Sequence, residues 1–231
     1  MKKKFFAFAI AVAMIFALTA CGGGQTESAE PAESETATEE KAAEETDYSQ
    51  IITDTAKQTV TVYAQVNGKY FAENSRHGVV FKDGSNGEKC IFRGLCSEKD
   101  FYGQMIAAGF EPGDNLPVPC EDDAIIEGQP LSVTVTWEGQ DEPVPFEKCI
   151  KTGDGKEYVG DWRFGGNIKK AYKANTGCIL CIESCPVGIV SNAAYGYGVI
   201  ENTKKQQFFG NDEVVPEDGT IVQITFAPRA E

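Results

Sequence analysis

GCILCIESCPVGIVSN, residues Gly177–Asn192, places Cys178, Cys181 and Cys185 close together and follows them with Pro186. Thiolates separated by two and three residues can converge on one soft metal ion or on one iron–sulfur cluster. They can also pair as disulfides, or a Cys-x-x-Cys pair can serve as a redox dithiol. The stretch therefore predicts a thiol site of one of these three kinds.

The cysteine spacing matches most of the bacterial ferredoxin motif, C-x2-C-x2-C-x3-C-P. Its last three cysteines and its proline are present, whereas Asn175 occupies the position of the first cysteine. The fourth cysteine of that motif binds the other cluster in two-cluster ferredoxins, so this segment alone does not complete one. A fourth ligand has to come from elsewhere in the chain, with Cys149 or Cys120 as candidates. Otherwise one iron of the cluster has no protein ligand.

Five segments of the chain resemble the YdjY-type family of ferredoxin-like lipoproteins. They are RFGGN at Arg163–Asn167, TGCILCIESCPVGIVSN at Thr176–Asn192, HGVVFKDG at His77–Gly84, DFYGQMIAAGFEPGDN at Asp100–Asn115 and FFGNDEVVPEDGTIV at Phe208–Val222. The resemblance extends over roughly the last two-thirds of the chain, and its most specific parts are the cysteine segment and Phe-Gly-Gly-Asn. It implies a redox or cluster-binding function.

Residues 1–20 have the features of a lipoprotein signal peptide. Three lysines precede an apolar run over Phe5–Leu18, which is too short to be interpreted first as a membrane-spanning helix. Leu18–Cys21 has the form of a lipobox, which predicts cleavage before Cys21 and lipidation of that cysteine. Plain secretion with an unmodified Cys21 is the alternative. Lipid chains would anchor the protein to the extracytoplasmic face of the cell membrane.

Residues 21–50 are expected to form a disordered acidic tether that begins at the lipidated cysteine. The segment carries nine acidic residues against one lysine and has almost no apolar side chain to bury. Such a composition stays disordered, and repulsion between its charges should extend it from an anionic membrane surface. Residues 51–231 then form one globular domain, since about 180 residues suffice to bury a core.

The charge balance argues against nucleic acid as a partner. The chain has a formal net charge of −14, whereas nucleic-acid binding needs basic patches. The expected partners are therefore the membrane, through the lipid anchor, and an unidentified redox protein.

Alternating apolar residues predict strands over Thr59–Val66, Leu131–Trp137 and Val222–Phe226. Two further strands, Gly78–Phe81 and Lys89–Arg93, are separated by Asp-Gly-Ser-Asn-Gly, which is typical of a hairpin turn. The domain is therefore expected to contain a mainly antiparallel sheet.

Two helices are predicted to cover this sheet. Ser97 can cap a helix that ends at Gly109. A shorter helix is expected over residues 168–175, which Asn167 can cap and Gly177 can end. The predicted fold class is therefore α+β, as a single domain after the tether.

The other candidate residues remain open on the sequence alone. His77 is the one histidine of the chain and could be a ligand or an acid–base group, although a structural role is the more common one. A ligand-binding pocket could use Trp162, Arg163 and Asn167. Seven cysteines follow the tether, and their odd number leaves one thiol over if all the others pair as disulfides.

From these observations we predict an iron–sulfur cluster on Cys178, Cys181 and Cys185, with Cys149 as the favoured fourth ligand. Zinc, or no cofactor, is the alternative. The protein would pass single electrons to or from its partner, so a redox carrier or binding protein is favoured over an enzyme. The competing hypothesis is a disulfide-stapled ligand-binding lipoprotein with no redox role.

Overall fold

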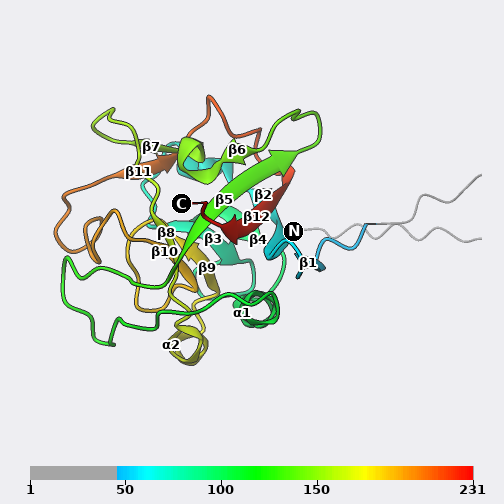
Figure 1. The fold of residues 1–231 in the computed structure, drawn as a ribbon. Helices are drawn as coiled ribbons and strands as arrows, with labels where there is room; N and C mark the ends of the chain where they lie inside the picture. Colours follow the sequence, from blue (N-terminus) through cyan, green and yellow to red (C-terminus); the bar gives the residue numbers. More distant parts are fainter. Residues whose placement is uncertain (1–45, 231) are drawn as a thin grey trace, which may run out of the picture. The chain divides into compact units, whose positions relative to one another are not determined.

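The three longest strands follow the alternation of apolar residues. The computed structural model describes residues 46–230, and in it β2 (Thr59–Val66), β5 (Gln129–Trp137) and β12 (Ile221–Pro228) bury alternate side chains along their central parts. β12 pairs antiparallel with both of the others, and Figure 1 shows the red β12 beside the long green β5. The three strands predicted from alternation are therefore confirmed.

Nine shorter strands complete the β-structure of the described residues. Their bounds are β1 (Ile51–Asp54), β3 (His77–Phe81), β4 (Cys90–Gly94), β6 (Val144–Pro145), β7 (Ile150–Thr152), β8 (Trp162–Phe164), β9 (Cys178–Cys181), β10 (Val190–Asn192) and β11 (Phe208–Gly210). The main sheet runs in the order β2-β12-β5-β8-β10-β9-β3-β4, and β4 pairs back onto β2. Within residues 46–230 the sheet is thus a closed barrel of eight strands, with β1 and β6 paired outside this circuit.

The closed barrel corrects the predicted fold class. An α+β sheet with covering helices was expected, whereas the described residues contain two short α-helices beside a sheet that closes on itself. Closure depends on the pairing of Ala64–Val66 with Phe92–Gly94, about thirty residues away along the chain. A local alternation of apolar residues indicates a strand but does not show which strands pair at such separations.

The predicted hairpin between β3 and β4 is also wrong. The two strands pair in parallel, so the residues between them cannot form a tight two-strand turn. The Asp-Gly-Ser-Asn-Gly segment instead hydrogen-bonds to the chain before β9, with the amide of Ser85 donating to the carbonyl of Asn175 at 2.9 Å. This crossing lets β3 lie between β4 and β9, where its residues reach the cysteine segment.

Both helices form where the sequence predicts them. α1 (Glu98–Ala107) begins at Ser97, whose side chain accepts a hydrogen bond from the amide of Asp100 at 3.1 Å. α2 (Ile168–Ala174) ends at Asn175, which has a left-handed conformation. The two helices lie near each other beside one end of the strands in Figure 1. Two 3-10 helices, η1 (Gly68–Phe71) and η2 (Phe146–Cys149), complete the elements.

The apolar core is divided into one large and one small cluster. The large cluster joins the inward side chains of the long strands to α1, as in the contact of Phe101 with Phe226, whose ring centroids are 4.7 Å apart. The small cluster contains Val80 and four cysteines. Among residues 46–230, no helix is long and apolar enough to cross a membrane. The predicted signal peptide, the predicted lipidation site Cys21 and most of the predicted tether lie outside the described residues.

Candidate metal centre

A local irregularity in β9 turns two cysteines toward the same side of the sheet. In a regular strand, residues three positions apart point to opposite faces. The pairing of β9 with β3 shifts register twice, leaving Gly78 and Ile179 as extra residues. As a result, Ile179 packs in the large core, whereas Cys178 and Cys181 both join the small cluster.

His77, the first residue of β3, completes a potential ligand set with these cysteines. It pairs with Cys181 across the two strands, and its Nδ1 atom lies 3.6 Å from the Sγ atom of Cys178. The ligand atoms of His77, Cys178 and Cys181 all lie within 4.8 Å of one another. Both cysteines are fully enclosed, while His77 is only half-buried.

Two more cysteines border this group. Cys185 is 2% exposed and packs in the same small cluster as Cys181. Cys90, at the start of β4, packs in the same small cluster, and its thiol donates a hydrogen bond to the carbonyl of Gly87 at 3.1 Å. Four sulfur atoms and one imidazole therefore meet beside the junction of β3, β4 and β9.

The protonation of the two β9 thiols is strongly coupled. The hydrogen bond with Cys181 holds the pKa of Cys178 well below its usual range; His77 acts in the same direction, against the opposing effect of burial. Hydrogen bonds with Cys178 and Cys185, together with burial, raise the pKa of Cys181 well above its usual range. The pKa values of the two thiols are therefore shifted apart, and the lower one belongs to the sulfur next to the imidazole.

The structure separates the other predicted ligand from this group. Cys149 packs in the large core, where its sulfur lies 4.0 Å from the carbonyl of Pro145. Cys96 also packs there, while Cys120 lies on a loop and is part-exposed. All seven cysteines of the described residues are free thiols. Cys178, Cys181 and Cys185 are thus brought together as predicted, but Cys149 is not beside them.

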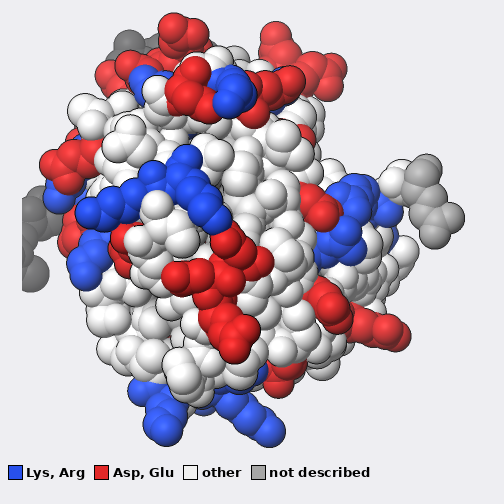
Figure 2. All heavy atoms as spheres, turned by 90° about the vertical axis from the view of Figure 1, so that its left-hand side faces the viewer, with Lys and Arg blue, Asp and Glu red and all other residues white. Residues whose placement is uncertain are grey.

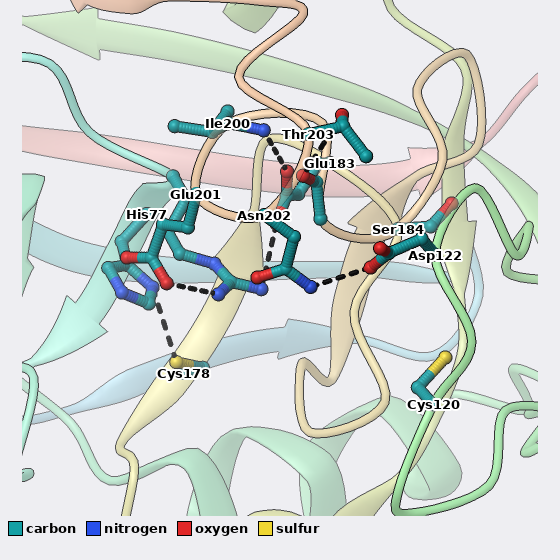
Figure 3. Close-up of polar contacts among 12 residues, drawn as sticks. His77, Cys120, Asp122, Cys178, Glu183, Ser184, Ile200, Glu201, Asn202 and Thr203 are labelled. Carbon is teal, nitrogen blue, oxygen red and sulfur yellow. Dashed lines mark hydrogen bonds and ion pairs between the residues drawn. The ribbon is translucent and has the colours of Figure 1, made fainter.

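A cleft of about 550 Å³ opens onto the edge of the cysteine cluster. Its lining includes His77, Cys185 and Cys120, together with Arg76 and Glu201. Figure 3 shows the His77–Cys178 contact on one side of the view and Cys120 on the other. The thiol group therefore borders solvent through Cys185 and His77 rather than through the two enclosed cysteines of β9.

An ion pair holds the segment between the cleft and the cluster. Arg76 contacts the enclosed carboxylate of Glu183 at 2.7 Å and the exposed Glu201 at 2.8 Å. Burial raises the pKa of Glu183, although the charge of Arg76 opposes this. The amide of Ile200 donates to the same carboxylate at 3.2 Å. These contacts fix the backbone between Cys181 and Cys185.

Asn167 fixes the segment that follows Cys185. The prediction that it caps α2 with its side chain is wrong, because that side chain makes no capping hydrogen bond. Its Nδ2 atom instead donates to the carbonyls of Cys185 and Gly188, both at 3.2 Å. Trp162 is buried in the large core and Arg163 pairs with Asp161 at 3.0 Å, so these three residues are not gathered around the cleft.

Two residues of the group were not assigned as ligands from the sequence. The sequence leaves His77 as an open candidate and does not point to Cys90 as a ligand. Their proximity to Cys178 depends on the parallel pairing of β3 with β4, which the expected hairpin excluded. The available signal was that the single histidine of the chain stands directly before a strand.

Comparison with known proteins places the chain in a family. The YdjY domain family matches residues 51–227, nearly all of the described barrel. "Uncharacterized protein YdjY" of Escherichia coli (strain K12) is 42% identical over 173 residues, which cover 75% of this chain and 76% of that protein. No solved structure matches. The described residues form a closed β-barrel with a group of thiols at its edge. The chain belongs to the YdjY domain family.

The surface of the domain carries charges of both signs. In Figure 2, which faces the left-hand side of Figure 1, acidic and basic side chains form interleaved groups with uncharged surface between them. This face therefore has no continuous surface of a single charge.

Proposed function

We propose that the barrel binds a single soft or borderline metal ion through His77, Cys178 and Cys181, with Cys185 as the fourth ligand. Zinc is the ion that suits this donor set best, because it is commonly bound by three cysteines and one histidine in tetrahedral sites. The observation that carries the proposal is the convergence of the first three ligand atoms within 4.8 Å of one another. A bound ion would join β3 to β9 and stabilise the barrel.

The distance between the two best-defined ligand atoms fits one shared ion. Bonds of about 2.3 Å from zinc to sulfur and about 2.0–2.1 Å from zinc to nitrogen, at a tetrahedral angle, put these atoms about 3.5 Å apart. The distance between Cys178 Sγ and His77 Nδ1 is 3.6 Å. The donors therefore need little movement to bind an ion between them.

This spacing favours a single ion over the cluster predicted from the cysteine motif. In a [4Fe–4S] cluster each cysteine binds a different iron, so the ligand sulfurs lie farther apart than around one ion. Iron–sulfur binding and electron transfer remain a prediction, and they differ from the proposal in a measurable way. A cluster contains inorganic sulfide and absorbs visible light, whereas a zinc site does neither.

We also propose that the protein works on the extracytoplasmic face of the cell membrane, anchored through lipid on Cys21. The sequence Leu18-Thr19-Ala20-Cys21 supports this part of the proposal. Mass spectrometry of the membrane fraction should find a lipid-modified Cys21 at the mature N-terminus. Cys21→Ala should release the folded protein from the membrane. An unmodified N-terminus at another residue would overturn the anchor but leave the metal site untouched.

The metal site is tested by anaerobic purification of the full-length protein, followed by analysis of zinc, iron and inorganic sulfide. One zinc ion per chain is expected, and it should be lost in Cys178→Ser and in Cys181→Ser. Cys96→Ser is the matched control, because that buried cysteine lies in the large core. Full disulfide pairing with no metal would support the disulfide-stapled binding protein instead.

A further inference from the structure

We propose that the cleft is the entry route for the metal ion, with Cys120 as the thiol that captures it and Cys185 as the thiol that passes it inward. This inference rests on the proposed metal site. The proposed route gives the protein a second, transient metal-binding position at Cys120. It also means that the buried centre can exchange its ion with the solvent. The ligand class is a soft or borderline cation such as Zn²⁺ or Cd²⁺.

The first reason is access. Cys178 and Cys181 are 0% and 1% exposed, so an ion cannot reach their sulfur atoms directly from solvent. The cleft meets the cysteine cluster at Cys185 and at His77, which both line it. Among the described cysteines, Cys120 and Cys185 are the two that line this cleft, and Cys120 is the one that is part-exposed.

The second reason is that the loop of Cys120 is held against the segment on the far side of the cleft. Asp122 accepts a hydrogen bond from Asn202 at 2.6 Å, and Figure 3 shows this contact. Asp123 adds an ion pair with Lys205 at 2.6 Å. The loop is therefore fixed with its thiol beside the cleft, where the thiol of Cys120 donates a hydrogen bond of 3.6 Å to the carbonyl of Glu121.

The third reason is that the charges at the cleft nearly balance. The lining has two basic side chains, Arg76 and Lys89. The carboxylates of both Glu201 and Glu183 are paired with the guanidinium of Arg76. A cation in the cleft therefore meets a neutralised arginine. Glu201 is mostly exposed and adds a negative charge at the cleft wall.

The transfer is a sequence of ligand exchanges without any change of oxidation state. The ion replaces the thiol proton of Cys120, and this proton goes to solvent. The ion then binds Cys185 as a thiolate, again with release of one proton, and Cys120 regains a proton as it leaves. Binding to Cys178 and Cys181 as thiolates, with release to solvent of each thiol proton still present, and to the neutral imidazole of His77 completes the site. Each step inward adds ligands, so the equilibrium favours the buried position.

The test measures how fast metal-free, reduced, full-length protein in detergent captures limiting Cd²⁺, followed by the absorbance of the cadmium–thiolate bonds. Cys120→Ser should slow capture by roughly ten- to a hundred-fold, the range found for residues that support a metal site. The final amplitude should equal that of the wild type. The control Cys96→Ala, which removes a thiol outside the cleft, should match the wild type.

A capture rate in Cys120→Ser equal to that of the wild type would overturn the entry route while leaving the metal site intact. Wild-type protein that binds no Cd²⁺ would overturn both. Iodoacetamide gives a second measurement: protein loaded with one ion should be alkylated at Cys120 alone, because this thiol is free again after transfer. Protection of Cys120 in the loaded protein would contradict the proposal, since it would make Cys120 a permanent ligand.

Discussion

The Sγ atom of Cys178 lies 3.6 Å from the Nδ1 atom of His77, although the two residues are 101 positions apart in the chain. β9 carries the cysteine and β3 the histidine, and the irregular pairing of these strands brings both side chains to the same cluster. A soft ligand and a borderline ligand at this distance are what a zinc-type ion requires. The predictions below follow from this pair and from its surroundings.

His77→Ala should weaken metal binding without unfolding the barrel. The substitution removes one of four ligands from a half-buried position, so the three thiolates remain. We expect the affinity to fall by at least about ten-fold, the lower end of the range for residues that support a metal site. Competition with a chromophoric chelator measures this change, and circular dichroism checks the fold. Unchanged affinity would remove His77 from the site.

Gly188→Ala should displace the sulfur of Cys181, although Gly188 is not itself a ligand. An added Cβ atom at this position would lie 2.9 Å from Cys181 Sγ and 2.7 Å from Ser191 Oγ, both too close for an ordinary contact. The sulfur therefore has to move, which should lower the affinity for Cd²⁺ or Zn²⁺ in the chelator competition.

Gly103→Ala is the matched control for this substitution. Its added Cβ would meet nothing within 4 Å, and it lies within α1, where alanine stabilises a helix by about 0.5–1 kcal/mol relative to glycine. Equal affinities of the two variants would show that the position of Cys181 does not matter for binding.

Cys149→Ala should leave the metal in place and change the stability at alkaline pH. Burial, and then the charge of Glu147, raises the pKa of Cys149 to about 12. Because this folded-state pKa lies above the ordinary value of 9.0, the thiol stabilises the fold fully below pH 9 and loses that contribution as the pH rises toward 12.

The loss amounts to about 1.4 kcal/mol per pH unit for one group. Urea unfolding of wild-type and Cys149→Ala protein between pH 8 and 11, in reductant, should therefore show a stability difference that shrinks as the pH rises. A constant difference would contradict this account. If Cys149→Ala lost its metal, Cys149 would have to be assigned as a ligand after all.

Arg76→Met should destabilise the domain strongly, because it leaves the enclosed carboxylate of Glu183 without its partner. Removing one member of a buried ion pair costs about 3–5 kcal/mol. The double variant Arg76→Met, Glu183→Gln should recover part of that loss, since no uncompensated charge remains. Chemical denaturation of the metal-free proteins measures both values. A loss in Arg76→Met as small as that of a surface substitution would contradict the structural role of this pair.

The sequence predicted local features of the fold well. The alternation in β2, the cap at Ser97 and the end of α2 depend on residues within one turn or one strand, and each is found in the structure. The barrel was not predicted because it depends on the pairing of β2 with β4. The parallel pairing of β3 with β4 was missed for the same reason, since a glycine-rich segment does not show that it crosses another strand.

The candidate site was likewise predicted where its residues are close in the sequence and missed where they come from distant strands. The spacing of Cys178, Cys181 and Cys185 was sufficient to place them in one group, because they share one strand and the turn after it. A ligand from a distant strand cannot be recognised from that spacing, so the sequence does not identify His77 as a ligand and does not exclude Cys149. The irregular register of β9 decides the outcome, and it depends on contacts of Gly78 that the sequence pattern does not express.

X-ray absorption at the metal edge of the natively purified, full-length protein tests the central claim most directly. The account predicts one ion per chain, with sulfur ligands at about 2.3 Å and one nitrogen ligand at about 2.0–2.1 Å. It predicts no second metal atom nearby, and loss of the nitrogen ligand in His77→Ala. An iron signal with a neighbouring iron and inorganic sulfide, or a protein that carries no metal, would contradict the single-ion centre.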